Sequence, residues 1–197
     1  MKKKILALAV VAMFTSIIAS GTLAYFTAEE KAHNVITSGG VAIELIEKTK
    51  GNDGVEVDFP KEGIQGVMPG TSVSKIVKVK NTGSGDAWIR IQVTPSIKNA
   101  SGEELPLEFG EEKIPVMEYD IFEEHWIDGG DGYYYHKEAI QADEFTEVLF
   151  EEVDFNAAMG NDYQNTIANI LIDVQAVQAA NNGASVMEAE GWPKNGE

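Results

Sequence analysis

The residues best suited to chemistry cluster between positions 124 and 138. His125 and His136 flank a glycine-rich loop, and Glu124 and Glu138 stand next to them. Imidazole nitrogens and carboxylate oxygens are ligands of Zn²⁺, so two histidines meeting across a hairpin could hold zinc. The simpler interpretation, two histidines that meet by chance on a hairpin surface, is favoured because each also has ordinary structural uses.

The loop between these histidines, residues 128–132, carries Asp128 and Asp131 among three glycines. Carboxylates suit Ca²⁺, but the spacing lacks the alternating acids and distant glutamate of an EF-hand loop. Asp and Gly are also the residues that tight turns require. The pattern therefore predicts a β-turn first and a weak calcium site only second.

Aromatic residues surround the same loop. Trp126 precedes it, and Tyr133, Tyr134 and Tyr135 follow it. In a strand Tyr133 and Tyr135 share one face, whereas Tyr134 and His136 share the other. An exposed aromatic face could stack on sugar rings or on another subunit. Cross-strand aromatic pairs that stabilise a hairpin are the favoured alternative.

Known catalytic motifs are missing from the chain. The sequence has no His-Glu-x-x-His, no Gly-x-Ser-x-Gly and no glycine loop of the phosphate-binding type. It has no cysteine, so a thiolate nucleophile, a thiolate zinc site and disulfide bonds are excluded. The 32 acidic residues show no spacing that singles out a glycosidase pair. We expect no enzyme activity, cofactor or metal.

The charge balance limits the partners. The 197 residues have a formal net charge of −17 at pH 7. Nucleic acids and anionic membranes are polyanions, so neither is an expected ligand.

The first 25 residues resemble an export signal. Three lysines, Lys2 to Lys4, precede an apolar run over residues 5–19 and then small residues. This is the layout of a secretory signal peptide, and the run is shorter than the roughly 20 residues of a membrane span. An uncleaved signal anchor is the alternative. Cleavage is expected near Ala24, Tyr25 and Phe26, which would leave a secreted chain with 12 basic and 32 acidic residues.

The rest of the chain has a period of two, typical of strands. From residue 87 to 93, Ala87, Ile89 and Ile91 alternate with Trp88 and Arg90. Further strands are expected over residues 41–47, 55–59, 72–80, 113–117, 125–128, 133–137, 146–155 and 170–177. Turn-forming residues recur about every ten positions, which predicts an all-β antiparallel sandwich of jelly-roll or immunoglobulin-like type. We expect one domain over residues 26–178, helical turns within 138–145 and 155–165, and a flexible tail over 179–197.

The expected strand 72–80 is rich in lysine. Lys75, Lys78 and Lys80 would form a solvated row that discourages edge-to-edge aggregation. A basic stripe that contacts an acidic neighbour is the alternative.

Two segments carry a resemblance to a known family. Gly21-Thr22-Leu23-Ala24-Tyr25-Phe26 stands at the end of the leader, and residues 34–43 read Asn-Val-Ile-Thr-Ser-Gly-Gly-Val-Ala-Ile. Met68-Pro69-Gly70 and Asn81-Thr82-Gly83 follow at either end of a strand. The arrangement resembles the TasA/camelysin family of exported Firmicutes proteins. It departs at Met68 and at Thr71, where the family commonly has lysine and an acid.

The resemblance implies a jelly-roll-like sandwich that forms extracellular fibres of a biofilm matrix after cleavage by a dedicated signal peptidase. It also implies that residues 26–38 are donated as a strand to the next subunit, with Phe26, Val35 and Ile36 as apolar anchors. Strand addition supplies main-chain hydrogen bonds, and a head-to-tail contact propagates into a filament. The expected partners are other copies of the chain and an accessory matrix or cell-wall component.

Two other functions stay open. A camelysin-like secreted metallopeptidase would have to assemble its site from His33, His125 and His136. A monomeric module that binds cell wall or carbohydrate would use Trp126 and the neighbouring tyrosines.

Overall fold

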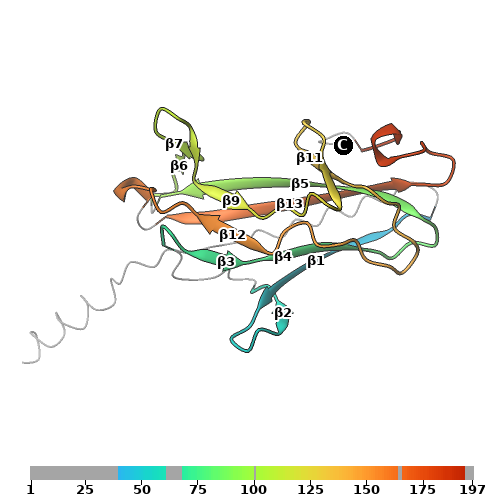
Figure 1. Ribbon diagram of the computed structural model, residues 1–197, viewed down its shortest axis with the longest axis horizontal. Helices are drawn as coiled ribbons and strands as arrows, with labels where there is room; N and C mark the ends of the chain where they lie inside the picture. The colour runs from blue at the N-terminus through green and yellow to red at the C-terminus, as the bar shows by residue number, and fades with distance from the viewer. Residues whose placement is uncertain (1–39, 61–67, 100, 164–165, 194–197) are drawn as a thin grey trace, which may run out of the picture.

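The computed structural model describes residues 40–60, 68–99, 101–163 and 166–193, which form strands in two layers (Figure 1). Every strand pair among these residues is antiparallel. The predicted all-β antiparallel sandwich is therefore confirmed. The predicted leader, residues 1–25, and the predicted donor segment, residues 26–38, lie outside the described residues.

The first layer is built on two long strands. β5 (Ala87–Lys98) and β13 (Ile167–Gln178) pair over their full twelve residues. β11 (Tyr133–His136) lies on the other side of β5, and β10 (Trp126–Asp128) lies beyond β11. A short strand, β6 (Glu104–Leu105), pairs with the end of β5.

The second layer contains two groups of strands. β1 (Ile43–Lys50) lies between β2 (Glu56–Asp58) and β4 (Ile76–Asn81). β12 (Glu152–Phe155) lies between β3 (Ser72–Ser74) and β9 (Met117–Tyr119). Backbone hydrogen bonds from residues 144–155 run along both β3 and β4 and join the two groups, for example Leu149 N–H to Val77 O at 2.8 Å.

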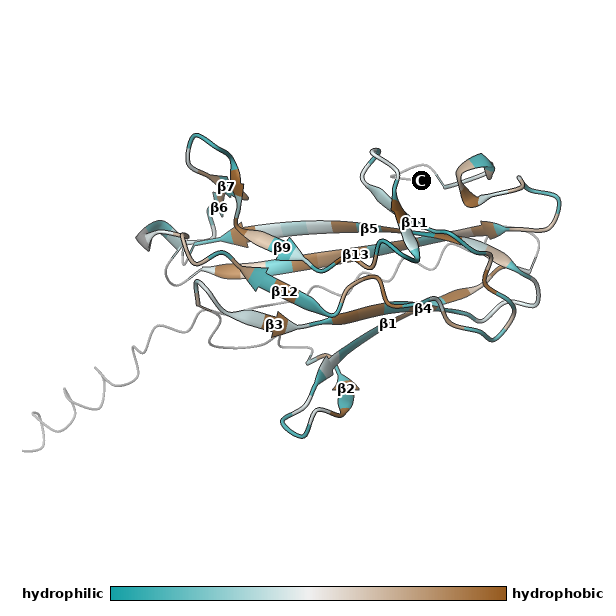
Figure 2. Ribbon diagram, in the orientation of Figure 1, coloured by the Kyte–Doolittle hydropathy of each residue, from teal (hydrophilic) through white to brown (hydrophobic). Residues whose placement is uncertain are grey.

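Aliphatic side chains fill the space between the layers. Ile89 and Ile91 of β5 and Ile172 of β13 meet side chains from the second layer, including Val79 and Phe150. Each of these five is at most 2% exposed. Colouring by hydropathy shows apolar stretches on β4, β5 and β13, which supply several of these side chains (Figure 2). Area burial of this kind is the main stabilising contribution in a chain that has no disulfide.

Lys75 interrupts the predicted strand 72–80. Lys75, Ile76 and Val77 are consecutive and all buried, which breaks the alternation between β3 and β4. The Lys75 ammonium forms an ion pair with Glu47 and lies 4.0 Å from the centre of the Phe59 ring. The prediction of a solvated lysine row is therefore wrong for Lys75. Lys78 and Lys80 are partly exposed, 3.5 Å from Glu56 and 4.0 Å from Asp143.

Several predicted elements differ in length. Only residues 152–155 of the predicted strand 146–155 pair as a regular strand. A 3₁₀ turn, η1 (Asn161–Tyr163), occurs within the predicted helical segment 155–165, whereas residues 138–145 form turns and isolated bridges. β8 (Ile114–Pro115) lies within the predicted strand 113–117, but its hairpin partner β7 (Glu108–Phe109) was not predicted.

The tail also differs from its prediction as a flexible segment. Residues 179–193 fold back over the outer face of the first layer and contain a 3₁₀ turn, η2 (Val186–Glu188) (Figure 1). Val186 is 1% exposed, and Trp192 packs against Tyr135. The Ala, Asn and Gly content of the tail gave no sign of this packing, because the partners of Val186 and Trp192 lie far away in the sequence.

Candidate functional site

Within the described residues, each layer has a long strand that pairs with a neighbour on one side only over much of its length. Among the described residues, β13 pairs with β5 alone, so one side of a twelve-residue strand has no strand beside it. β1 pairs with β4 from Ile43 to Lys48 but with β2 only from Lys48 to Lys50. The first half of β1 is therefore also paired on one side only within the described ranges, and β1 approaches β13 across the layers.

The side chains behind this edge are apolar. Ile170, Ile172 and Val174 of β13 are at most 2% exposed and belong to the core, as does Ile43 of β1. Leu45 of β1 is partly buried at the margin of the core. An extended segment placed along the edge could pair its backbone with either strand and place alternate apolar side chains over this margin. The anchors predicted for such a segment, Phe26, Val35 and Ile36, lie outside the described residues, as do Ala24 and Tyr25.

The aromatic hairpin belongs to the body of the domain. Trp126 is 2% exposed, donates from Nε1 to the carbonyl oxygen of Val148 at 3.1 Å, and meets the His136 ring edge-on. Tyr133 and Tyr135 lie on the opposite face, under the tail. The predicted division into a Tyr133/Tyr135 face and a Tyr134/His136 face is confirmed. Since Trp126 is buried, it does not offer a surface on which a sugar ring can stack.

His136 is occupied by protein groups. It is 1% exposed, its Nδ1 lies 2.8 Å from the Glu138 carbonyl oxygen, and its Nε2 lies 2.7 Å from Glu147 Oε2. Partial burial opposes the charge on Glu147, but hydrogen bonds from its own backbone and from His136 outweigh burial and lower the pKa of Glu147. Neither ring nitrogen is left for a metal. In the described part of the chain no group of three His, Asp or Glu side chains is placed to hold a metal ion.

The loop carboxylates serve the turn. Asp128 Oδ1 accepts from the Gly130 N–H at 2.8 Å, and Asp131 Oδ1 accepts from the Tyr133 N–H at 3.1 Å. Asp131 Oδ2 accepts from the Tyr135 hydroxyl at 2.6 Å, and this bond lowers the pKa of Asp131. The loop is closed by a backbone hydrogen bond from the Gly129 N–H to the Tyr133 carbonyl oxygen at 2.9 Å, and its carboxylates bind groups of the hairpin itself.

Arg90 is a polar centre that sequence reasoning missed. It is 8% exposed, although it lies on the face of β5 that alternates with the core. Its guanidinium donates to Gln175 Oε1 at 2.7 and 3.0 Å, to the Tyr135 hydroxyl at 3.0 Å and to the Pro193 carbonyl oxygen at 3.2 Å. It also stacks 3.9 Å from the centre of the Tyr133 ring and 4.7 Å from that of Trp192. An arginine between two isoleucines, two residues after Trp88 in a strand pattern, was the available signal.

Arg90 thus ties the tail to the first layer. The remaining atoms of the cluster are also paired, since Gln175 Nε2 donates to the Tyr133 hydroxyl at 3.1 Å and Trp88 Nε1 donates to the Asn182 carbonyl oxygen at 2.9 Å. One polar side chain in the described residues departs from this rule: the Tyr119 hydroxyl is buried without a hydrogen-bond partner. Burial strongly raises the pKa of Tyr119.

No helix formed by the described residues has the length and hydropathy to cross a membrane. Comparisons with family models, with curated proteins and with solved structures found no match to this chain.

Proposed function

We propose that this chain is a secreted structural protein that assembles with copies of itself into fibres of an extracellular biofilm matrix. In this proposal each subunit contributes its N-terminal segment, residues 26–38, as a strand to the open edge of the next subunit. The observation that carries the proposal is the open side of β13, which is paired on one side only among the described residues. A long unpaired strand edge is a template for adding another chain.

The proposed donor segment lies close to β1 in the sequence. β1 begins at Ile43, so the proposed donor segment precedes it by only a few residues. Because every copy would carry both a donor segment and an acceptor edge, the copies would contact one another head to tail. Such contacts extend into a filament when the rotation between subunits does not close a ring. Removal of the leader would free the donor end, which makes a dedicated signal peptidase part of the proposal.

The test is fibre formation by the processed protein, followed by electron microscopy. A variant with Val35→Asp and Ile36→Asp is expected to remain monomeric, because charged side chains cannot enter an apolar margin without a large desolvation cost. Val55→Asp combined with Val57→Asp adds the same two charges at surface positions, where Val55 is 58% and Val57 is 47% exposed, and is expected to form normal fibres. Normal fibres from the variant with Val35→Asp and Ile36→Asp would overturn the proposal.

A synthetic peptide with the sequence of residues 26–38 tests the acceptor directly. Added in excess to processed protein, it is expected to shorten fibres by occupying the edge, whereas the same peptide with aspartate at positions 35 and 36 should not. Equal fibre lengths with both peptides would count against strand donation.

The strong negative charge also bears on assembly. Processed subunits would repel one another at low ionic strength, so salt or mild acid should promote association. Light scattering is expected to rise as the pH falls from about 7 to about 5, because carboxylates then lose charge. A fall in scattering over this range would contradict the proposal.

A further inference from the structure

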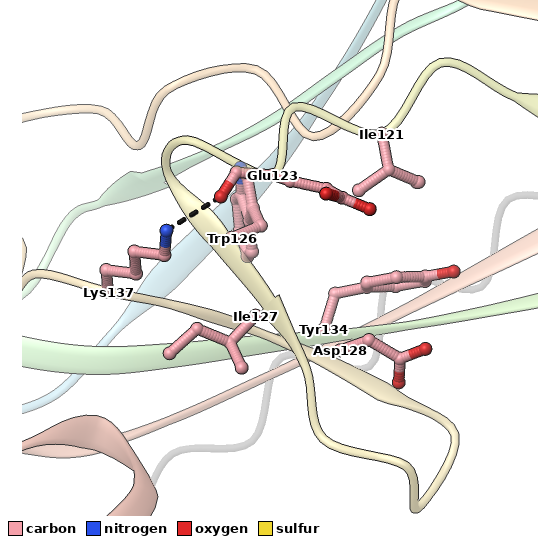
Figure 3. A pocket seen from close by; sticks show the side chains of 7 residues that line it. All are labelled: Ile121, Glu123, Trp126, Ile127, Asp128, Tyr134 and Lys137. Carbon is pink, nitrogen blue, oxygen red and sulfur yellow. Dashed lines mark hydrogen bonds between the residues drawn. The ribbon is translucent and has the colours of Figure 1, made fainter.

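A small pocket opens beside the aromatic hairpin (Figure 3). Its volume is about 330 Å³, and it is lined by Ile121, Glu123, Trp126, Ile127, Asp128, Tyr134 and Lys137. This volume is at the lower end of the range of about 300–1,000 Å³ found for small-ligand sites. The pocket therefore suits a single side chain or a group of similar size.

The pocket has an apolar floor. Ile121, Ile127 and Tyr134 are each partly buried and partly accessible, so they offer hydrocarbon and ring surface to a ligand. Trp126 lies deeper and is almost wholly covered. Burial, together with the nearby Asp128 carboxylate, raises the pKa of Tyr134, which keeps its hydroxyl neutral.

The charges around the pocket are separated into two ends. The Glu123 and Asp128 carboxylates point to the same side as the Tyr134 hydroxyl, whereas Lys137 lies at the opposite end (Figure 3). The Lys137 ammonium donates to the carbonyl oxygens of Glu123 at 2.7 Å and Glu124 at 2.9 Å. Neither the Glu123 nor the Asp128 carboxylate forms an ion pair with a described residue.

We propose that this pocket binds a basic side chain, lysine or arginine, presented by a partner protein. The aliphatic stem would pack on Ile121 and Ile127, as long charged side chains do on apolar surfaces. The cationic end would lie against the Tyr134 ring and between the two carboxylates, combining cation–π attraction with charge-assisted hydrogen bonds. The net charge of −17 favours the approach of a cation and gives a neutral sugar no such advantage.

This proposal does not depend on fibre formation, so monomeric protein can be used to test it. The probes are Nα-acetyl-lysine methylamide and Nα-acetyl-arginine methylamide. They are titrated into isotope-labelled processed protein that carries Val35→Asp and Ile36→Asp, which is expected to stay monomeric, and binding is followed by NMR. Shifts are expected at the Trp126 indole N–H and at the backbone amides of Ile127 and Tyr134. The matched uncharged probe, Nα-acetyl-norleucine methylamide, is expected to bind at least about fivefold more weakly, because it keeps the stem and loses the charge.

Variants of the pocket sharpen the assignment. Asp128→Asn retains an acceptor for the Gly130 N–H and removes one charge, so it should weaken binding of the basic probes about fivefold. Glu124→Gln removes the same charge one residue outside the lining and should change binding less than about twofold. Thermal unfolding midpoints of both variants establish that they are folded.

The outcomes separate this site from its rivals. Equal weakening by Asp128→Asn and Glu124→Gln would mean diffuse attraction to an acidic surface and would overturn the proposal. Equal binding of the norleucine probe would overturn it as well. Shifts of the same residues with tri-N-acetylglucosamine, in the absence of shifts with the basic probes, would assign the pocket to carbohydrate and reject a basic side chain.

Discussion

The two faces of the β5–β13 ribbon are buried in different ways. The inner face presents Ile89, Ile91 and Ile172 to the second layer, and all three are at most 2% exposed among other apolar side chains. The outer face presents Arg90 and Gln175 to tyrosines and to the tail. The inner face is closed by a sheet, whereas residues 179–193 cover the outer face only around Arg90 and Gln175, and Thr94 farther along β5 is exposed.

This difference shows what each face depends on. The inner face depends on volume, because apolar burial has no direction and mainly requires that no cavity is left. The outer face depends on direction, because the Arg90 guanidinium must meet oxygen acceptors on a strand and on the tail at once. The inner face therefore tolerates rearrangement of similar volumes, whereas the outer face tolerates little change at Arg90.

The largest loss of stability should come from a cavity in the core between the two layers. Phe150 is fully buried, so Phe150→Ala should lower the free energy of unfolding by about 3–5 kcal/mol. Phe145→Ala is the matched control, since Phe145 is 48% exposed and should cost less than about 1 kcal/mol. Urea unfolding measures both variants. Similar losses of unfolding free energy in the two variants would mean that packing between the two layers is not the dominant source of stability.

Loss of the Arg90 side chain should have the second-largest effect on stability. Arg90→Ala leaves the Gln175 and Pro193 oxygens without their donor in a covered site and should cost about 2–4 kcal/mol. Arg90→Lys keeps the charge but not the planar fork, so it should recover less than half of that loss. Full recovery by lysine in urea unfolding would show that charge, and not direction, holds the outer face.

Removal of the tail anchor should have a smaller and more local effect. Trp192→Ala removes the stacking on Arg90 and Tyr135 and should cost about 1–2 kcal/mol. Hydrogen exchange should speed up in residues 179–193, while the amides of β5 and β13 stay protected. Met187→Ala serves as the control because Met187 is 50% exposed. An equal increase in exchange rate throughout the domain would contradict the idea that the tail packs on the first layer as a separate unit.

The smallest effect on stability should come from the contact between Glu147 and His136. The folded-state pKa of Glu147 is lowered from 4.5, so its stabilising contribution is present above that pH. The contribution should disappear as the pH falls below 4.5 through the lowered folded-state value. Glu147→Gln should therefore flatten this part of the stability curve and leave the Arg90 cluster unaffected. An unchanged acid limb in pH-dependent thermal unfolding would argue against the Glu147–His136 contact.

Local pattern was enough to predict where most of the longer strands lie and how the hairpin faces divide. Alternation placed Ala87, Ile89 and Ile91 on one side of a strand, and Tyr133 and Tyr135 opposite Tyr134 and His136. Turn residues separated the strands. These features depend on neighbours along the chain, because side chains alternate with period two in any strand and turns are formed by a few adjacent residues.

The tertiary structure alone decided what covers each face. The sequence could not show that Lys75 turns inward to Glu47, that Trp126 is buried, or that Arg90 binds the carbonyl oxygen of Pro193, 103 residues away. Alternation reports that a face is covered or exposed, but a polar side chain gains a buried place only when distant groups supply its partners. The fold brings these partners together, and the local pattern does not contain them.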